Sequence, residues 1–149
     1  MQKQNQDIIV FDAKDKILGR LASTAAKSLL QGKSVAVINA ENAVISGNKH
    51  TIAARYRTRL NLQEKANPEH SPYWSRRPDM LVKRIIRGML PYNRPKGKSA
   101  YRRLKVYIGV PDELRSAKPI EIKTKEPKKL YVGHVKVGDL STLLGYTRK

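Results

Sequence analysis

The chain of 149 residues contains no cysteine, and it contains few acidic residues. The lack of cysteine excludes disulfide bonds, zinc sites built on thiolates and cysteine nucleophiles. Only 12 Asp and Glu residues stand against 31 Lys and Arg residues, which gives a formal net charge of +19. Self-repulsion of this size destabilises a compact state, so we expect a polyanionic partner. Nucleic acid is the first candidate and an anionic membrane surface is the second.

Long apolar runs are also missing. No run approaches the roughly 18 apolar residues of a membrane-spanning helix, and the N-terminal sequence MQKQNQD lacks the apolar region of a signal peptide. We therefore expect an intracellular, soluble protein. The length and the absence of an internal repeat predict a single domain over 1–149, with residues 1–6 as a flexible lead-in.

Motifs for catalysis, nucleotide binding and metal binding are missing as well. The sequence contains neither G-x-G-x-x-G nor G-x-x-x-x-G-K-[ST]. His50, His70 and His134 have no His partner at helical spacing, so they form no helical metal pair. Asp12 is the best-placed single acid, at the end of a strand, but a turn or capping role fits it better than catalysis. We expect no enzymatic activity, no metal, no cofactor and no small-molecule substrate.

Basic residues are concentrated in the stretch from Arg76 to Gly109. Its apolar residues recur at helical spacing between Pro78 and Leu90, so the stretch is ordered and is not a basic tail. Asp79 is the only acid between residues 76 and 105, so the eleven basic residues there give a net charge of 11 − 1 = +10. These basic residues are Arg76, Arg77, Lys83, Arg84, Arg87, Arg94, Lys96, Lys98, Arg102, Arg103 and Lys105. We interpret this stretch as a folded part whose outer face binds a polyanion backbone.

Apolar runs and helical patterns alternate along the chain. This order predicts a mainly parallel sheet with helices on both faces. Strands are predicted at 8–11, 35–38, 43–45 and 106–108, helices at 16–31, 48–60, 78–90 and 139–144, a helical turn at 100–104 and a weak strand within 130–137. Residues 112–130 have no clear period, and we expect an irregular surface extension that is ordered only on its partner.

Two features allow more than one interpretation. In the long proline-containing loop 61–77, Trp74 could stack on nucleic-acid bases beside Arg76 and Arg77, or it could fill a gap in the core. Gly19, within the first predicted helix, could permit close packing against the sheet or the approach of another group to the backbone.

RNA is favoured over duplex DNA as the partner. The sequence contains no helix-turn-helix, zinc-finger or basic-zipper pattern, and a mixed α/β body with irregular basic loops suits folded RNA. An RNA-modifying enzyme would need a polar catalytic cluster beside the basic residues of 76–105, and none is visible in the sequence. A peripheral membrane protein would need bulky apolar residues exposed beside that face.

Several motifs together resemble family thirteen of the large-subunit ribosomal proteins. The similarity covers about residues 7–146, and its motifs occur in the order and spacing of the family. They are Asp12-Ala13 with Leu18–Ser23, Val37–Glu41, Ile45–Gly47, Ile86–Pro91, Gly97-Lys98, Leu104–Gly109, and Val137–Ser141 with Leu144-Gly145. The link Gly32–Ser34 and the loop Ser71–Trp74 are similar to the archaeal and eukaryotic branch of the family.

The resemblance implies a three-layer α/β/α fold with a four-stranded, mainly parallel sheet, plus basic loops and a C-terminal extension. It implies a structural component of the large subunit of the cytoplasmic ribosome that binds the large-subunit rRNA early in assembly. Neighbouring ribosomal proteins would be further partners, and no obligate homo-oligomer is expected. The family has no catalytic residues to carry over.

The resemblance also implies which residues contact rRNA, namely those of the basic helix and of the loop after it. These residues are Lys83, Arg84, Arg87, Arg94, Lys96, Lys98, Arg102 and Arg103. Charge and aromatic content add a second group from the two preceding segments, made up of Arg55, Arg59, Tyr73, Trp74, Arg76 and Arg77.

Overall fold

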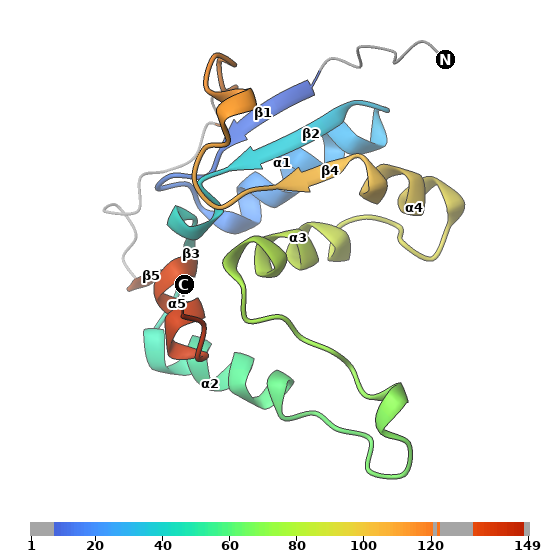
Figure 1. Cartoon of the computed structure of the whole chain (residues 1–149), viewed down its shortest axis with the longest axis vertical. Coiled ribbons are helices and arrows are strands. Elements are labelled where there is room, and N and C mark those ends of the chain that lie inside the picture. Colours follow the sequence, from blue (N-terminus) through green and yellow to red (C-terminus); the bar gives the residue numbers. More distant parts are fainter. Residues whose placement is uncertain (1–7, 121, 123–132, 148–149) are drawn as a thin grey trace.

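The body of the protein is built on a three-stranded parallel sheet. The computed structural model describes residues 8–120, 122 and 133–147. Strands β1 (Ile8–Asp12), β2 (Ser34–Ile38) and β4 (Leu104–Val106) lie in the order β1-β2-β4, with β2 central and all three parallel (Figure 1). The predicted strands at 8–11 and 35–38 are confirmed, and the strand predicted at 106–108 begins two residues earlier.

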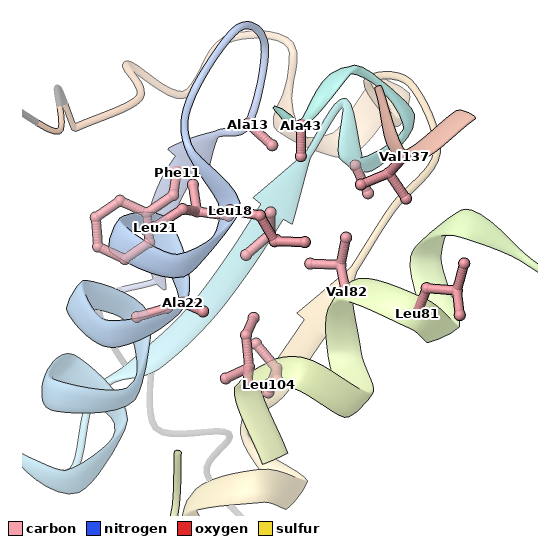
Figure 2. Close-up of a cluster of buried hydrophobic side chains, with 14 of the residues drawn as sticks. Phe11, Ala13, Leu18, Leu21, Ala22, Ala43, Leu81, Val82, Leu104 and Val137 are labelled. Carbon is pink, nitrogen blue, oxygen red and sulfur yellow. The ribbon is translucent and has the colours of Figure 1, made fainter. Parts of the chain in front are cut away.

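Three helices cover one face of this sheet, namely α1 (Leu18–Leu30), α3 (Pro78–Gly88) and α4 (Pro95–Arg102). Because side chains alternate along a strand, Phe11, Val37 and Leu104 point to this side and form the main core with the helices. Figure 2 shows part of that cluster, including Leu21 of α1 and Val82 of α3. The apolar stripe that the sequence predicts for the third helix is therefore the side that packs against the body.

The other face of the sheet carries a smaller apolar cluster. Val10, Ala36 and Ile38 are buried there under Tyr107, Leu114 and Ala117. Among the described residues, the cover is the 3-10 helix η3 (Asp112–Leu114) with its adjoining loop, and not a second layer of α-helices. The three-layer arrangement is therefore not confirmed.

Part of the expected surface extension is ordered on the protein itself. The backbone N–H of Ile120 donates to the carbonyl of Val10 at 2.8 Å, and Ile122 is buried in the main core. The expectation that 112–130 is ordered only on a partner is thus wrong for residues 112–120 and for Ile122. The rest of that segment and the lead-in 1–6 lie outside the described residues.

The fourth predicted strand, β3 (Val44–Ser46), does not pair within the parallel sheet. It pairs antiparallel with β5 (His134–Lys136) in a separate two-stranded sheet. β3 touches the body through the backbone, where Val44 N donates to Lys16 O at 2.9 Å. The single four-stranded sheet is therefore not confirmed, because an apolar run indicates a buried strand but not its neighbour.

Residues 49–77 form an arm that projects away from the body (Figure 1). The arm consists of α2 (Lys49–Leu60), the 3-10 helix η2 (Pro68–His70) and the loop that returns to α3. Asn48 caps α2 by accepting a hydrogen bond from His50 N at 2.9 Å. The helix predicted at 48–60 is confirmed, but it packs against the terminal helix α5 (Val137–Leu143) and not against the sheet.

Two hydrogen bonds fasten the arm to α5. Arg57 Nη2 donates to the carbonyl of Leu143 at 3.4 Å, and the buried hydroxyl of Ser141 donates to the carbonyl of Arg76. Ala53 is the one fully buried residue of α2, and Ile52, Tyr56 and Leu60 pack partly buried against the main core. The position of the arm therefore depends on apolar packing together with these polar contacts.

Candidate nucleic-acid interface

The outer sides of α3 and α4 carry the basic residues that the sequence singles out. On α3, Leu81, Val82 and Ile86 are buried, while the basic residues lie half-buried on the other sides of the helix. On α4, Gly97 and Ala100 are buried. Four exposed cations of this region form no hydrogen bond or ion pair through their side chains with any described residue, and they are Arg94, Lys96, Lys98 and Arg102.

Aromatic rings, and not carboxylates, contact the cations of α3. The ammonium of Lys83 lies 5.1 Å from the ring centroid of Tyr101, and the guanidinium of Arg87 lies 4.5 Å from that of Tyr92. Tyr92 and Tyr101 in turn meet edge to face at 5.4 Å. A ring attracts a cation without cancelling its charge, so these two residues are held in position and keep their positive charge.

A second cluster joins α3 to the arm. The guanidinium of Arg84 lies 3.7 Å from the ring centroid of Trp74, and that of Arg59 lies 5.0 Å from the same ring and 5.3 Å from the ring of Tyr56. Arg84 Nη1 also donates to the carbonyl of Tyr73 at 2.8 Å. Burial, followed by the charges of Arg87 and Arg59, lowers the pKa of Arg84 from its ordinary value. Burial also disfavours the charged form of Tyr56 and so raises the pKa of its hydroxyl.

Trp74 contacts the arginines and not the core. Its ring is half-buried against two guanidinium groups and does not belong to the main core, so the interpretation of Trp74 as a core residue is not supported. The neighbouring Tyr73 is instead the aromatic residue presented to solvent, with an exposed fraction of 85%.

The other basic residues predicted at the site differ in their surroundings. Arg77 forms a bidentate pair with the buried carboxylate of Asp79, at 3.2 Å and 2.9 Å, and this hydrogen bonding raises the pKa of Arg77. Asp79, the one acid in the basic stretch, is thus already paired. Arg55 and Arg76 are exposed, and the side chain of neither forms an ion pair with a described residue.

Arg103 lies differently from its expected position. Its Nη2 donates to the carbonyl of Leu29 at 2.9 Å, and its Nε is buried without a hydrogen-bond partner among the described residues. Leu29 is in the last turn of α1, where backbone carbonyls lack helical partners. Arg103 therefore joins α4 to the end of α1, and we leave it out of the basic face.

The sequence prediction missed the tyrosines that hold the cations. Tyr56, Tyr92 and Tyr101 carry no motif, yet each ring contacts a basic side chain. The composition of the segment could have predicted these contacts. A folded segment with eleven cations and one acid must hold its cations by something other than carboxylates.

Features of other functions are not found in the described part of the chain. There, no three His, Asp or Glu residues cluster as a metal site would require. None of the described helices combines the length and apolar character needed to cross a membrane. Asp12 accepts hydrogen bonds from Lys14 N and Asn39 Nδ2, both at 2.9 Å, which confirms its predicted role in a turn.

Comparison with known proteins identifies the family. Residues 6–113 match the family model of ribosomal protein L13. A protein of Methanosphaera stadtmanae is 40% identical over 139 residues, covering 93% of this chain and 97% of its own. Proteins of Methanococcoides burtonii and Methanosarcina barkeri are 46% and 45% identical, each covering 91% of this chain and 96% of its own. All three are named large ribosomal subunit protein uL13. These matches confirm the resemblance found in the sequence, including its archaeal character, and the chain belongs to the ribosomal protein L13 family.

Proposed function

We propose that this protein is a structural component of the large ribosomal subunit and binds the large-subunit rRNA through the outer sides of α3 and α4. As a ribosomal protein of archaeal type, it takes part in translation in the cytoplasmic ribosome. One observation carries the rRNA proposal. The cations of α3 and α4 are held by aromatic rings or stand unpaired, and the one acid of the stretch is paired with Arg77.

We define the basic face by the seven cations that remain after Arg103 is removed from the predicted set. They are Lys83, Arg84, Arg87, Arg94, Lys96, Lys98 and Arg102. Phosphate oxygens are suitable partners for such a face, since Arg binds them in bidentate geometry and Lys binds them as a point charge. Binding would release counterions condensed on the RNA, which favours association at low salt. The contacts would recognise the backbone and shape of folded RNA more than its sequence.

We also propose that the protein binds early in assembly, with neighbouring large-subunit proteins as later partners. The support is that the basic face is complete within one chain. Three of its cations, Lys83, Arg84 and Arg87, are positioned by rings of the same chain, so no second protein is needed to order these three. Binding to protein-free rRNA is therefore the appropriate measurement.

A structural role is preferred over an RNA-modifying enzyme or a membrane-surface protein. Asp12, the best-placed acid, is engaged in a turn. Leu81, Val82 and Ile86 of α3 are buried in the core, which leaves Met80 as the one large apolar side chain of this helix that is exposed. Turnover of RNA by the pure protein, or binding to anionic vesicles as tight as to rRNA, would contradict the proposal.

The test is a charge reversal with a matched control. Lys96→Glu with Lys98→Glu reverses two exposed charges of the basic face. Arg115→Glu with Lys118→Glu makes the same change in charge near η3, which covers the opposite face of the sheet. We expect the first pair to weaken binding to protein-free large-subunit rRNA by about tenfold or more near 0.1 M salt, and the second pair to have a much smaller effect.

Two results would contradict the proposal. Equal losses of affinity from the two pairs would show that net charge matters and that the basic face does not. Fractionation of a cell lysate on a sucrose gradient tests the assembly directly, since absence of the protein from the large subunits would rule out a ribosomal role.

A further inference from the structure

The arm contains an open hollow whose wall carries Tyr73. The hollow lies between the end of α2 and the loop before α3, and its walls include Leu62, Pro68, Pro72, Trp74 and Arg76. Tyr73 has the highest exposed fraction, 85%, among the large apolar side chains that are exposed in the described residues. An aromatic ring left in water at this position gains nothing for the fold, so a binding role is worth testing.

The backbone that carries this ring is held on both sides. The carbonyl of Tyr73 accepts from Arg84 Nη1 at 2.8 Å, and the next residue, Trp74, lies beneath Arg84 and Arg59. Two residues further on, the carbonyl of Arg76 accepts from Ser141 of α5. The exposed ring therefore projects from a segment attached to α2, α3 and α5, so little conformational entropy would be lost on binding.

Arginine side chains lie in and beside the hollow. Arg76 and Arg77 lie in its walls, and Arg77 is neutralised by Asp79. Glu69 also lies in the walls, while Arg59 and Arg84 contact the adjoining face of the arm through Trp74. Arg84 contacts Trp74 in the wall of the hollow and is also a cation of the basic face, so the hollow adjoins that face. A planar apolar ring beside a free guanidinium suits a nucleotide, whose base stacks and whose phosphate pairs.

We propose that Tyr73 stacks on an unpaired base of the RNA, with Arg76 placed to pair with a phosphate of the same strand. This inference rests on the proposed function. Trp74, Arg84 and Arg59 are positioning residues, because they fix the loop that presents Tyr73. A base inside a duplex is covered by its neighbours, so the occupant is a single-stranded loop, bulge or end. Every base has a π face, so stacking alone imposes little sequence preference.

The experiment compares two RNAs that differ only in their bases. One is an unstructured ten-nucleotide RNA with a fluorescent label, and the other is its abasic counterpart, which keeps the sugar-phosphate backbone. Binding is followed by fluorescence anisotropy at fixed salt. Tyr73→Ala should weaken binding to the RNA with bases by about tenfold, and it should leave binding to the abasic RNA unchanged. Tyr73→Trp, which keeps a stacking surface, should bind both RNAs like the wild type.

Control variants separate this inference from the proposed function. Ile120→Ala removes an exposed apolar side chain from the segment beside β1 and should change neither affinity. Equal binding of wild type and Tyr73→Ala to the RNA with bases would overturn the inference and leave the basic face intact. An equal loss on both RNAs would also overturn it, since the contact would then be with the backbone. Failure of the wild type to bind the RNA with bases would also overturn the inference, whereas the proposed function is tested separately by binding to protein-free rRNA in the same buffer.

Discussion

At the residue scale, aromatic rings occupy the positions where carboxylates would usually hold basic side chains. Arg84, Arg87 and Lys83 each lie over a ring, at 3.7, 4.5 and 5.1 Å from its centroid. A carboxylate would fix a cation more strongly but would compete with phosphate for it. A ring fixes the cation weakly, by about 0.5–1 kcal/mol at an exposed site, and leaves its charge for the RNA.

Arg84 tests this arrangement because it contacts Trp74, the one tryptophan of the chain. Arg84→Lys keeps the charge but removes the planar group that covers the ring and donates to Tyr73 O. We expect acrylamide to quench Trp74 fluorescence more readily in this variant, and the free energy of unfolding to fall by about 1 kcal/mol. Arg87→Lys is the matched control, since Arg87 lies over Tyr92. Equal quenching in the two variants would show that Arg84 does not shield Trp74.

The sequence predicted which residues are basic and exposed, but not what holds them. Lys96, Lys98 and Arg102 follow from local charge, and the structure leaves them exposed. Arg103 contacts Leu29, which lies 74 positions earlier in the chain. Such a pairing depends on the tertiary packing of α4 against α1, and a local pattern carries no information about it.

At the element scale, the sequence predicted the helices and strands better than their neighbours. The apolar periodicity that located α1, α2 and α3 is a property of each segment alone. Which other segment it packs against is not a property of the segment alone. The pairing of β3 with β5 and the packing of α2 on α5 were therefore missed. Only a turn was predicted where α4 forms, because Pro95 and Gly97 resemble loop residues. Pro95 in fact occupies the first turn of α4, where its lack of an N–H costs nothing.

The connection between α3 and α4 depends on Gly97. A Cβ atom built at Gly97 would lie 2.1 Å from the carbonyl oxygen of Pro91, and this neighbour is backbone. Gly97→Ala should therefore force α4 away from the segment that connects it to α3 and lower the free energy of unfolding by about 1–3 kcal/mol. Urea unfolding followed by circular dichroism measures this change.

Gly19→Ala is the matched control for this substitution. A Cβ atom at Gly19 would meet nothing within 4 Å, so the interpretation that Gly19 permits close packing against the sheet is not supported. Because alanine favours the helix over glycine, Gly19→Ala should raise the free energy of unfolding by up to about 1 kcal/mol. If Gly97→Ala were as stable as the wild type, the tight contact with Pro91 would not constrain the two helices.

At the scale of the whole molecule, the body and the arm project in different directions. The body carries the basic face on α3 and α4, while the arm extends α2 and the loop after it away from the body (Figure 1). The net charge of +19 opposes compaction of the free protein, and binding to RNA would relieve this repulsion. The contribution of the face can be measured through salt, since each phosphate contact releases counterions.

The number of cations on the basic face predicts the salt dependence of rRNA binding. Seven contacts at about −0.7 each give a slope of log K against log salt concentration of about −5 (7 × 0.7 = 4.9). Arg103 is not counted, because its guanidinium donates to Leu29 O at the end of α1 and its Nε is buried. The measurement is a series of affinities for protein-free rRNA between about 0.1 and 0.5 M KCl. Lys96→Gln with Lys98→Gln should make the slope shallower by about 1.4, whereas Arg115→Gln with Lys118→Gln should leave it unchanged. A wild-type slope near −2 would mean that most of the basic face stays in water when RNA binds, and that shape or stacking supplies the affinity instead.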